Sequence, residues 1–554
     1  MTVHVPNLLR RNRACHAALL AVLALAALPA AAQFTIAGTL VNAQTGEPVA
    51  HANMAVLSLE DSHALISVTA DDAGHFSLPG LPAAKYQLTA SRRGFHTAFY
   101  DEHGEFSSAV VTGPDVTGQV QDTTHLVFRL APNAVLYGAV RDDAGEPVAQ
   151  ASVLLFRKPA SPAERIIQAG AATTDDTGAY EFGNLAAGAY LLAVKAEPWY
   201  ALHPAPNHAG NPQLDVAYPI TYYDSTTDEN SAAPVDLVAG ARVEANVTLQ
   251  AVPALRLQIA VPRNQQGSLA RPELRRSVFG TEIAAQSAGF LDAATTGSTE
   301  INGVAPGHYE LQQGDPPRLA ELDATTSGTL DPGAGTPLVD VQGQLHAAAG
   351  SALPPEISVV LTRTDASDDR QPVLQSAHNG AFHFQAPAAS AWQLAVASTS
   401  QPQANLTVLS VRAAGPSQPG DRFAVGSQPL ALSAEVSAAA TSITGFARKD
   451  HKPFSGAMIV LIPRARNPQA FAADAQAVFA SLVRRDQSDS DGSFSLMSVV
   501  PGSYTVVAIE DGWDLDWSNP AVMARYAAGG AAVTVPPDAG KSVSLSGPVA
   551  VESR

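Results

Sequence analysis

The sequence predicts an all-β fold, arranged as a tandem array of about five small β-sandwich domains with little helix. The main observation is an internal repeat, because five times a turn glycine is followed twelve residues later by a tyrosine or tryptophan. The pairs are Gly74 and Tyr86, Gly178 and Tyr190, Gly297 and Tyr309, Gly380 and Trp392, and Gly492 and Tyr504. Apolar and polar residues also alternate around each pair, and 41 glycines with 40 prolines supply many turns.

The alternation identifies strands on both sides of each spacing. Phe76 and Leu78 follow the first turn glycine, and Leu88 and Ala90 follow the first tyrosine. A period of two is that of a strand with one buried face. Asp or Asn before the glycine predicts a hairpin turn, because glycine adopts positive φ readily. A one-residue change in the spacing would move the apolar set to the solvent face, which explains why the length is constant.

A second shared block precedes the repeat in the first, second and fifth units. In the first unit it is Ile-Ala-Gly-Thr-Leu-Val (36–41), then Thr-Gly-Glu-Pro-Val (45–49), then an apolar run over 52–57. The block predicts strand, turn and strand. The fourth unit matches it loosely, and the third unit lacks it and has Thr299 where the others have an aromatic residue.

These patterns predict the domain organisation. Residues 124–130 and 243–249 have the pattern of closing strands, which gives about six or seven strands per unit, as in a two-sheet sandwich. The expected segments are a signal peptide (1–32), unit 1 (33–131), unit 2 (132–252), unit 3 (253–338, divergent), unit 4 (339–437) and unit 5 (438–554).

Helix is expected in only two places, both in unit 5. Residues 468–485 carry an apolar stripe at helical spacing and predict an insertion that packs on the sandwich. A single helical turn is expected near 519–526.

The first 32 residues predict export. Arginines at 10, 11 and 13 precede an apolar run over 17–28, and Ala30 to Ala32 supply the small residues of a cleavage site. The alternative is an uncleaved anchor. The one cysteine, Cys15, would leave with the signal, so disulfides and thiol chemistry are not expected. No later run is long enough to span a bilayer, and the net charge of −18 argues against nucleic acid as a partner. The final location is the periplasm, the cell surface or the medium.

The motif Gly-Thr-Leu-Val, Gly-Glu-Pro-Val, Asp-Asp-Ala-Gly-His-Phe and Leu-Pro-Ala-Ala-Lys-Tyr of unit 1 resembles the carboxypeptidase regulatory-like domain. Units 2 and 5 match this pattern well, unit 4 moderately and unit 3 poorly. The resemblance implies a transthyretin-like, immunoglobulin-like sandwich, related to the B-type repeats of collagen adhesins. The whole chain looks like secreted multi-domain proteins of acidobacteria. The resemblance implies a non-catalytic module found beside zinc carboxypeptidases, and it implies a fold rather than peptidase activity.

The sequence offers no catalytic, cofactor or metal site to which we assign a role. A zinc carboxypeptidase needs His-x-x-Glu with a distant histidine, and no histidine has glutamate three residues on. The pairs His96 with His103 and His203 with His208 could hold a stray metal ion but are read as solvated loop residues. Asp-Ser-Asp-Gly (489–492) resembles the start of a calcium loop, but its register with four other turns favours a turn.

Aromatic loop residues are the candidate ligand-binding residues. They lie near the ends of units 2 and 5 and comprise Trp199, Tyr200, Tyr222, Tyr223, Trp513 and Trp517. Exposed aromatic rings beside acceptors can stack on sugars, whereas buried rings would cap the sandwich cores. Both interpretations stand at this point.

The expected function is therefore that of a non-enzymatic exported protein. We expect a cell-envelope scaffold, adhesion or protein-interaction module, whose partner is an envelope or extracellular protein bound through sheet edges. The first alternative is a carbohydrate-binding protein that uses the aromatic loops and has a glycan partner. A zinc carboxypeptidase-type enzyme is the third candidate.

Overall fold

The computed structural model confirms an all-β fold of tandem sandwiches. It describes residues 33–60, 65–114, 118, 120–159, 161, 164–198, 216–260, 272–284, 298–313, 318–331, 335–348, 352–364, 372–398, 406–413, 418–419, 421–437, 441–464, 479, 482–499, 501–536 and 542–554. The expected signal peptide lies outside these residues.

Unit 1 is a sandwich of two sheets. Its described strands are β1 (Phe34–Asn42), β2 (Asn53–Ser58), β3 (Leu65–Thr69), β4 (His75–Leu81), β5 (Lys85–Ser91), β6 (Ala98–Phe99), β7 (Val110–Val111) and β8 (Leu126–Leu130). One sheet has the order β4-β1-β8, and the other has β3-β2-β5-β6 with β7 also on β5. The closing strand β8 runs parallel to β1.

Unit 2 repeats this arrangement. Its described elements are β9 (Ala134–Arg141), β10 (Ser152–Lys158), β11 (Ile167–Thr173), β12 (Ala179–Leu185), β13 (Gly188–Lys195), β14 (Val216–Ala217), β15 (Thr221–Tyr222), η1 (Glu229–Ser231), β16 (Val235–Leu237), β17 (Arg242–Glu244) and β18 (Val247–Thr248). The two sheets are β12-β9-β17 and β11-β10-β13-β15. A Cβ added to Gly138 would lie 2.0 Å from the carbonyl oxygen of Ala245, so this glycine lets the closing segment approach β9.

Units 3 and 4 share a continuous sheet. The strands of unit 3 are β19 (Val252–Pro253), β20 (Leu255–Ala260), β21 (Glu273–Val278), β22 (Thr281–Ala284), β23 (Ser298–Val304), β24 (Gly307–Gln313), β25 (Arg318–Ala324) and β26 (Gly328–Leu330). Strand β27 (Thr336–Ala347) pairs with β25 at its first two residues and with unit 4 thereafter. The expected boundary at 338 therefore falls inside a strand that both units use.

The remaining strands of unit 4 form the rest of its sandwich. They are β28 (Glu356–Arg363), β29 (Val373–His378), β30 (Ala381–Pro387), β31 (Ser390–Ser398), β32 (Thr407–Arg412), β33 (Gln418–Pro419), β34 (Arg422–Val425) and β35 (Leu430–Ser437). The closing strand β35 runs parallel to β27.

Unit 5 carries the one α-helix of the described residues that is longer than a turn. Its elements are β36 (Ile443–Lys449), β37 (Lys452–Pro453), β38 (Met458–Pro463), β39 (Arg484–Gln487), β40 (Ser493–Leu496), β41 (Gly502–Glu510), α5 (Pro520–Ala527), β42 (Ala531–Val535), β43 (Val543–Ser544) and β44 (Val549–Ser553). The helical turn expected near 519–526 is confirmed as α5, which Asn519 caps through its side chain. Most of the helix expected at 468–485 lies outside the described residues, and its last two residues belong to β39 instead.

Each unit has its own hydrophobic core, and the aromatic residue of the repeat is buried in it. The exposed fractions are 3% for Tyr86, 2% for Tyr190, 5% for Tyr309, 4% for Trp392 and 2% for Tyr504. The expectation that this residue fills the core is confirmed. Three of the tyrosines also donate a hydrogen bond to the carbonyl four residues upstream, as in Tyr190 to Ala186 at 2.9 Å.

The turn glycines of units 1 and 2 occur where expected, but their turns do not form hairpins. In unit 4, β29 and β30 do pair at His378 and Ala381, on either side of Gly380. Gly74 has φ 75°, and its N–H donates to Asp71 O at 3.0 Å. The strands on either side, β3 and β4, lie in different sheets. The same holds for β11 and β12. The chain changes sheet at the turn because the apolar sides of both strands must face the core between the sheets.

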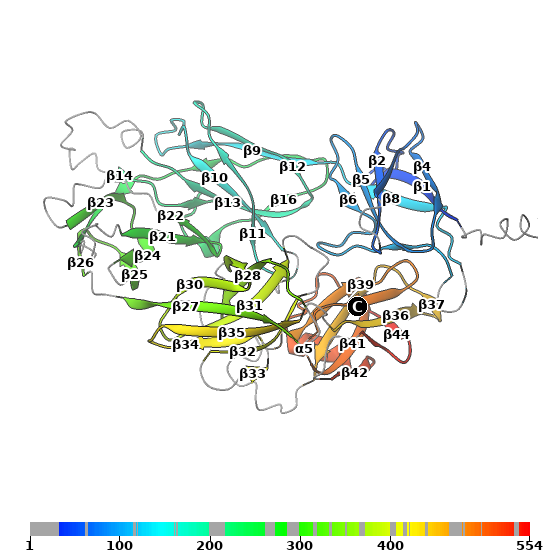
Figure 1. The fold of residues 1–554 in the computed structure, drawn as a ribbon. Coiled ribbons are helices and arrows are strands. Elements are labelled where there is room, and N and C mark those ends of the chain that lie inside the picture. The colour runs from blue at the N-terminus through cyan, green and yellow to red at the C-terminus, as the bar shows by residue number, and fades with distance from the viewer. Residues whose placement is uncertain are drawn as a thin grey trace, which may run out of the picture.

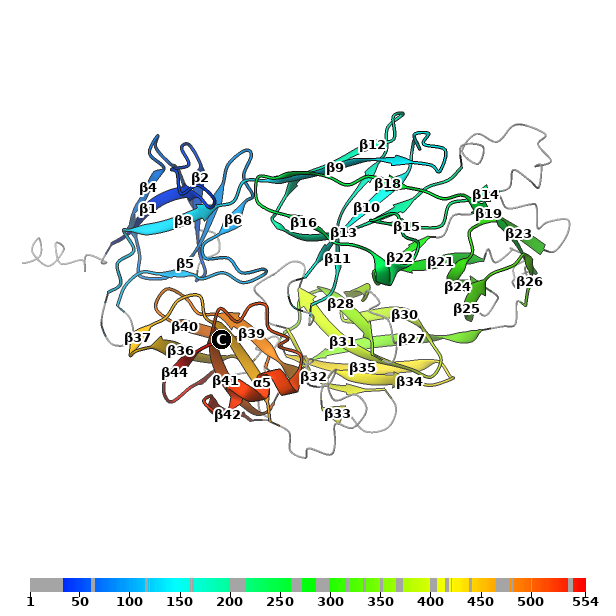
Figure 2. The ribbon, with the colours of Figure 1, turned by 180° about the vertical axis from the view of Figure 1, so that it is seen from behind.

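The five units fold back on themselves so that the first and last lie together. Figures 1 and 2 show units 1 and 2 side by side in one row, units 4 and 5 below them, and unit 3 at the far end where the chain reverses. Unit 5 lies against unit 1 in both views. The array is therefore compact rather than an extended rod.

Candidate interaction surfaces

Three units present an open edge strand at the same place in the sandwich, directly before the turn glycine. Strand β3 pairs only with β2 among the described strands, and β11 only with β10. Strand β29 pairs along its length with β28 and meets β30 only at His378 and Ala381. None of the three strands contains Asp, Glu, Lys or Arg. Their exposed apolar side chains are Leu65 (65%), Ile66 (44%), Ile167 (54%) and Leu374 (70%).

The backbone of β3 presents hydrogen-bonding groups to the open side. The N–H of Ala70 donates to Ala52 O at 2.9 Å. The backbone N–H and C=O groups of the even-numbered residues of β3 therefore point toward β2. The backbone N–H and C=O of Ser67 therefore point away from β2, to the open side of the edge strand. An extended segment of another protein could pair with them.

The equivalent strand of unit 5 is different, because it is charged and covered. Strand β39 has the sequence Arg-Arg-Asp-Gln. Its Arg485 side chain is 8% exposed, and Nη2 lies 3.1 Å from Glu164 Oε1 and 3.5 Å from Glu105 Oε1. The guanidinium also lies over the rings of Phe106 at 5.0 Å and Trp517 at 4.4 Å. Acidic loops of units 1 and 2 thus cover this edge.

The turn after β39 docks into unit 1. Lys85 Nζ lies 2.5 Å from Asp489 Oδ2 and 2.8 Å from Ser493 Oγ, and the N–H of Ala109 donates to Asp489 Oδ1 at 2.8 Å. Burial raises the pKa of Asp489, and Lys85 opposes that shift. The corresponding Asp71 of unit 1 is 57% exposed. The same turn is therefore a docking element in unit 5 and a solvent-exposed turn in unit 1.

Further hydrogen bonds extend this contact between units 1 and 5. The N–H of Ser490 donates to Ala109 O at 3.0 Å, and the N–H of Val111 donates to Ser490 Oγ at 2.9 Å. Ser108 Oγ donates to Ser488 O at 2.9 Å, and Gln487 Nε2 donates to Ser108 Oγ at 2.8 Å. No sequence pattern predicts this contact. Its one sequence signal is that residues 484–486 are all charged, whereas the matching strands of units 1, 2 and 4 are not.

Comparison with protein families identifies the first two units. The model of the carboxypeptidase regulatory-like domain matches residues 35–131 and 135–250. Units 1 and 2 thus match the carboxypeptidase regulatory-like domain, and the matched residues make up less than half of the chain. The match covers two of the three units in which the sequence motif is clear, and the expected resemblance is confirmed there.

Comparison with solved structures finds pilins. The minor pilin GBS52 of Streptococcus agalactiae is 13% identical, with 40% of this chain and 96% of the pilin covered and a TM-score of 0.21. A streptococcal ancillary pilin is 13% identical, with coverages of 54% and 98% and a TM-score of 0.20. The shaft pilin SpaA of Lactobacillus rhamnosus GG is 10% identical, with coverages of 40% and 98% and a TM-score of 0.18. These scores are too low to carry a functional inference. No curated protein matches the sequence.

The predicted aromatic residues of unit 5 lie in its contact with the first regulatory-like domain. Trp513 stacks on His103 with ring centroids 5.0 Å apart and an interplanar angle of 8°, and it meets Phe106 at 5.5 Å. Its Nε1 donates to Gly456 O at 3.3 Å. Trp517 lies under the guanidinium of Arg485. One face of the Trp513 ring and one face of the Trp517 ring are therefore covered by side chains of the protein.

Of the predicted residues of the second regulatory-like domain, Tyr222 lies at its contact with unit 3. Tyr222 is fully buried, donates to Glu229 Oε2 at 2.9 Å and packs against Phe279 of unit 3 at 5.2 Å. Tyr223 is half-buried against the core of its own domain. Trp199 and Tyr200 lie outside the described residues, so carbohydrate binding through them stays a prediction.

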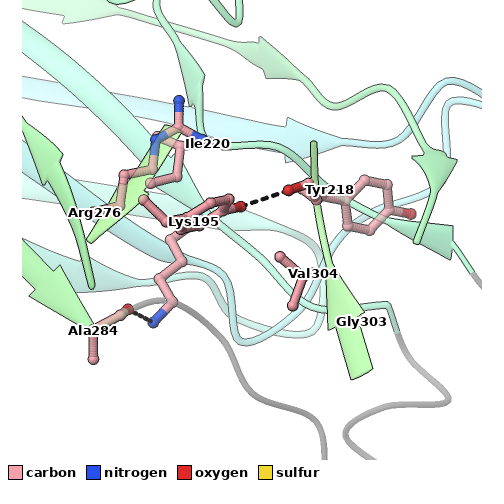
Figure 3. Close-up of a pocket in the computed structure, with 9 residues that line it drawn as sticks. Lys195, Tyr218, Ile220, Arg276, Ala284, Gly303 and Val304 are labelled. Carbon is pink, nitrogen blue, oxygen red and sulfur yellow. Dashed lines mark hydrogen bonds between the residues drawn. The ribbon is translucent and has the colours of Figure 1, made fainter. Parts of the chain in front are cut away.

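A cavity of about 20 Å³ lies between the second regulatory-like domain and unit 3, lined by Lys195, Tyr218, Arg276 and Tyr309 among others. This volume suits about one water molecule. Figure 3 shows that the Lys195 ammonium points to the carbonyl of Ala284, at 2.8 Å, while the Arg276 guanidinium points the other way. The two cations therefore do not converge on a common ligand.

No group of three or more His, Cys, Asp or Glu side chains in the described part of the chain is placed to hold a metal ion. Of the suggested histidine pairs, His103 contacts Gln487 Oε1 at 3.1 Å, and His203 and His208 lie outside the described residues. The turn carboxylate of Asp491 accepts from the N–H of Ser493 at 2.9 Å. Within the described ranges, no helix is long and apolar enough to cross a membrane.

Proposed function

We propose that this chain is a non-catalytic, exported scaffold of the cell envelope that binds partner proteins through the open sheet edges of units 1, 2 and 4. The observation that carries this proposal is the set of three uncharged strands β3, β11 and β29. Strands β3 and β11 are paired along one side only, and β29 meets β30 on its second side at a single residue pair. Long, uncharged edges invite pairing, and proteins usually block them with charge or cover. Here unit 5 has both kinds of protection, and the other three units have neither.

The compact arrangement supports this function. The contact between units 1 and 5 links residues about 380 positions apart in the sequence. It holds the edge-bearing units in one body, so that several weak strand-pairing sites act together on one partner. A hollow of about 940 Å³ also adjoins β29, lined by residues of β27, β29, β30 and β35. Such a hollow gives room for side chains of an added strand.

Panning a phage library of random twelve-residue peptides on the purified chain tests the proposal. We expect enrichment of peptides in which apolar, β-branched residues alternate with polar ones, as strand addition requires. A triple variant, Ser67→Pro, Ala171→Pro and Ser376→Pro, should lose these peptides because proline blocks edge pairing. A matched variant, Ser67→Ala, Ala171→Ser and Ser376→Ala, should keep them.

Two outcomes would overturn the proposed function. One is that no strand-like peptide is enriched on the parent chain. The other is that enriched peptides bind equally to the proline variant, whose fold is checked by circular dichroism. If the triple variant fails to fold, the three single proline variants are compared instead, and each should lose part of the binding.

A further inference from the structure

The edge of unit 1 is flanked by acidic residues at both ends. Glu60 precedes β3, and Asp71 and Asp72 follow it. The side chains of Asp71 and Asp72 are 57% and 94% exposed. Hydrogen bonds, chiefly from the N–H of His75, lower the pKa of Asp71, so its carboxylate stays ionised at neutral pH. Strand β3 itself, Leu-Ile-Ser-Val-Thr, is uncharged.

Exposed apolar side chains lie at the end of the sheet near Glu60, on both of its faces. Leu59 is 42% exposed, Leu65 65% and Ile66 44%. The N–H of Leu59 donates to Lys85 O at 2.9 Å, and Lys85 is the residue that holds Asp489.

The chain itself shows how charge selects the cover of such an edge. Strand β39 carries Arg485, and the groups that meet this side chain are the carboxylates of Glu105 and Glu164. A basic edge is thus covered by acidic loops. By the same charge complementarity, the uncharged edge strand β3 with acidic residues at its ends fits a partner strand that is uncharged at its centre and basic at its ends.

We propose that β3 of unit 1 binds an extended segment of a partner protein that has apolar and β-branched residues at its centre and lysine or arginine at both ends. This inference rests on the proposed function and adds the chemistry of the partner. Backbone pairing at Ser67 would supply affinity, and Glu60 on one side with Asp71 and Asp72 on the other would select the ends.

A second copy of this chain is a poor fit for the same edge. In either strand orientation, pairing of β3 with β3 places acidic residues of one copy beside acidic residues of the other. Like charges across a strand pair are destabilising. Self-association is therefore an outcome of the test rather than its expected result.

The test uses three fluorescent peptides that share a centre of alternating valine and threonine. Their ends carry lysine, serine or glutamate, and binding to the full chain is measured by fluorescence anisotropy at low and high salt. We expect the lysine-ended peptide to bind about 5- to 10-fold more tightly than the serine-ended one at low salt, from one exposed ion pair at each end. High salt should reduce this ratio, and the glutamate-ended peptide should bind least.

Two variants locate the effect. Asp72→Lys should make the affinities of the lysine-ended and serine-ended peptides nearly equal. The substitution should leave the fold intact, because the side chain of Asp72 is highly exposed. Asp143→Lys is the matched control, because this exposed aspartate lies in another turn, away from β3. It should leave the ratio as in the parent chain.

The outcomes separate this inference from the proposed function. If the three peptides bind equally well, or if Asp143→Lys lowers the ratio as much as Asp72→Lys, the inference fails and edge binding stands. If none of the peptides binds, both fail. If sedimentation shows self-association that Ser67→Pro abolishes, a second copy occupies the edge and the inference is overturned.

Discussion

The hydroxyl of Tyr190 donates a hydrogen bond of 2.9 Å to the carbonyl oxygen of Ala186, four residues before it. Tyr86 and Tyr309 do the same to Pro82 and Ala305. The tyrosine of the repeat thus has two roles. Its ring fills the core, and its hydroxyl forms a hydrogen bond with the segment that connects the two sheets. This explains why tyrosine occurs at these three positions rather than phenylalanine.

Replacing this hydroxyl should have a small and defined cost. We expect Tyr190→Phe to lower the free energy of unfolding by about 0.5–1.5 kcal/mol, because one net hydrogen bond is lost. Tyr190→Ala should cost about 3–5 kcal/mol, because a buried ring is removed as well. Chemical denaturation followed by fluorescence measures both values. An equal cost for the two variants would contradict the division of tasks.

The turn glycine of unit 2 has a close neighbour as well as a positive φ. A Cβ on Gly178 would lie 2.4 Å from Val140 O, and Gly178 has φ 75°. Gly145 has φ 84°, but a Cβ added to it would have no other atom within 4 Å. We expect Gly145→Ala to cost about 1 kcal/mol from backbone strain alone, and Gly178→Ala to cost clearly more because the clash adds to the strain. Equal melting temperatures for the two variants would rule out the clash.

The pairing of Lys85 with Asp489 should control closure of the array. We expect Lys85→Met to loosen the contact between units 1 and 5, because Asp489 is left buried without its cation. The expected cost is about 1–3 kcal/mol, with a larger radius of gyration in small-angle scattering. The double variant Lys85→Met with Asp489→Asn should recover part of the loss. Unchanged scattering for Lys85→Met would show that this pair does not hold the array closed.

The pH dependence of stability should carry the signature of a buried carboxyl group. The pKa of Asp486 is raised to about 7, chiefly by burial and also by the nearby charge of Asp489, while the N–H of Ser495, at 2.6 Å, and Lys85 oppose the shift. The folded state then holds a proton that the unfolded state releases near pH 4. The free energy of unfolding should therefore fall as the pH rises from about 4 to about 7.

Substitution separates this group from the others. We expect Asp486→Asn to reduce the decrease in the free energy of unfolding with rising pH. At pH 8 this variant should be more stable than the parent chain by about 1–3 kcal/mol, because no charge is buried. Asp71→Asn should act in the opposite direction, since hydrogen bonding lowers the pKa of Asp71 and its contribution is lost on acidification. A parent chain whose stability rises from pH 4 to pH 7, with the same rise in Asp486→Asn, would exclude this role.

The local features of the fold could be predicted from the sequence, and the contacts between units could not. Gly178, Tyr190 and the alternating residues between them report local backbone and burial, so turn and strands follow from them. The sheet that each strand joins is not in this pattern, which is why the turns were expected to form hairpins. Trp513 meets its neighbour His103 across 410 positions of sequence, and no periodicity reports such a contact.

The candidate sites were predicted in part for the same reason. Aromatic residues mark both burial and binding, so the sequence could not say that Tyr222 lies in a core between units 2 and 3. Sheet edges were expected to bind partners, but which edges stay open depends on how unit 5 lies against unit 1. The charged sequence of β39 was the available signal.

Hydrogen exchange of backbone amides, read by mass spectrometry, tests the central claim most directly. The chain is measured with and without saturating lysine-ended strand peptide. We predict slower exchange in residues 65–69 when the peptide is bound, because an added strand pairs with the N–H groups on the open side of β3. Residues 484–487, already covered by unit 1, should exchange at the same rate in both samples. Peptide binding that leaves the exchange of 65–69 unchanged, or that slows only 484–487, would contradict the account.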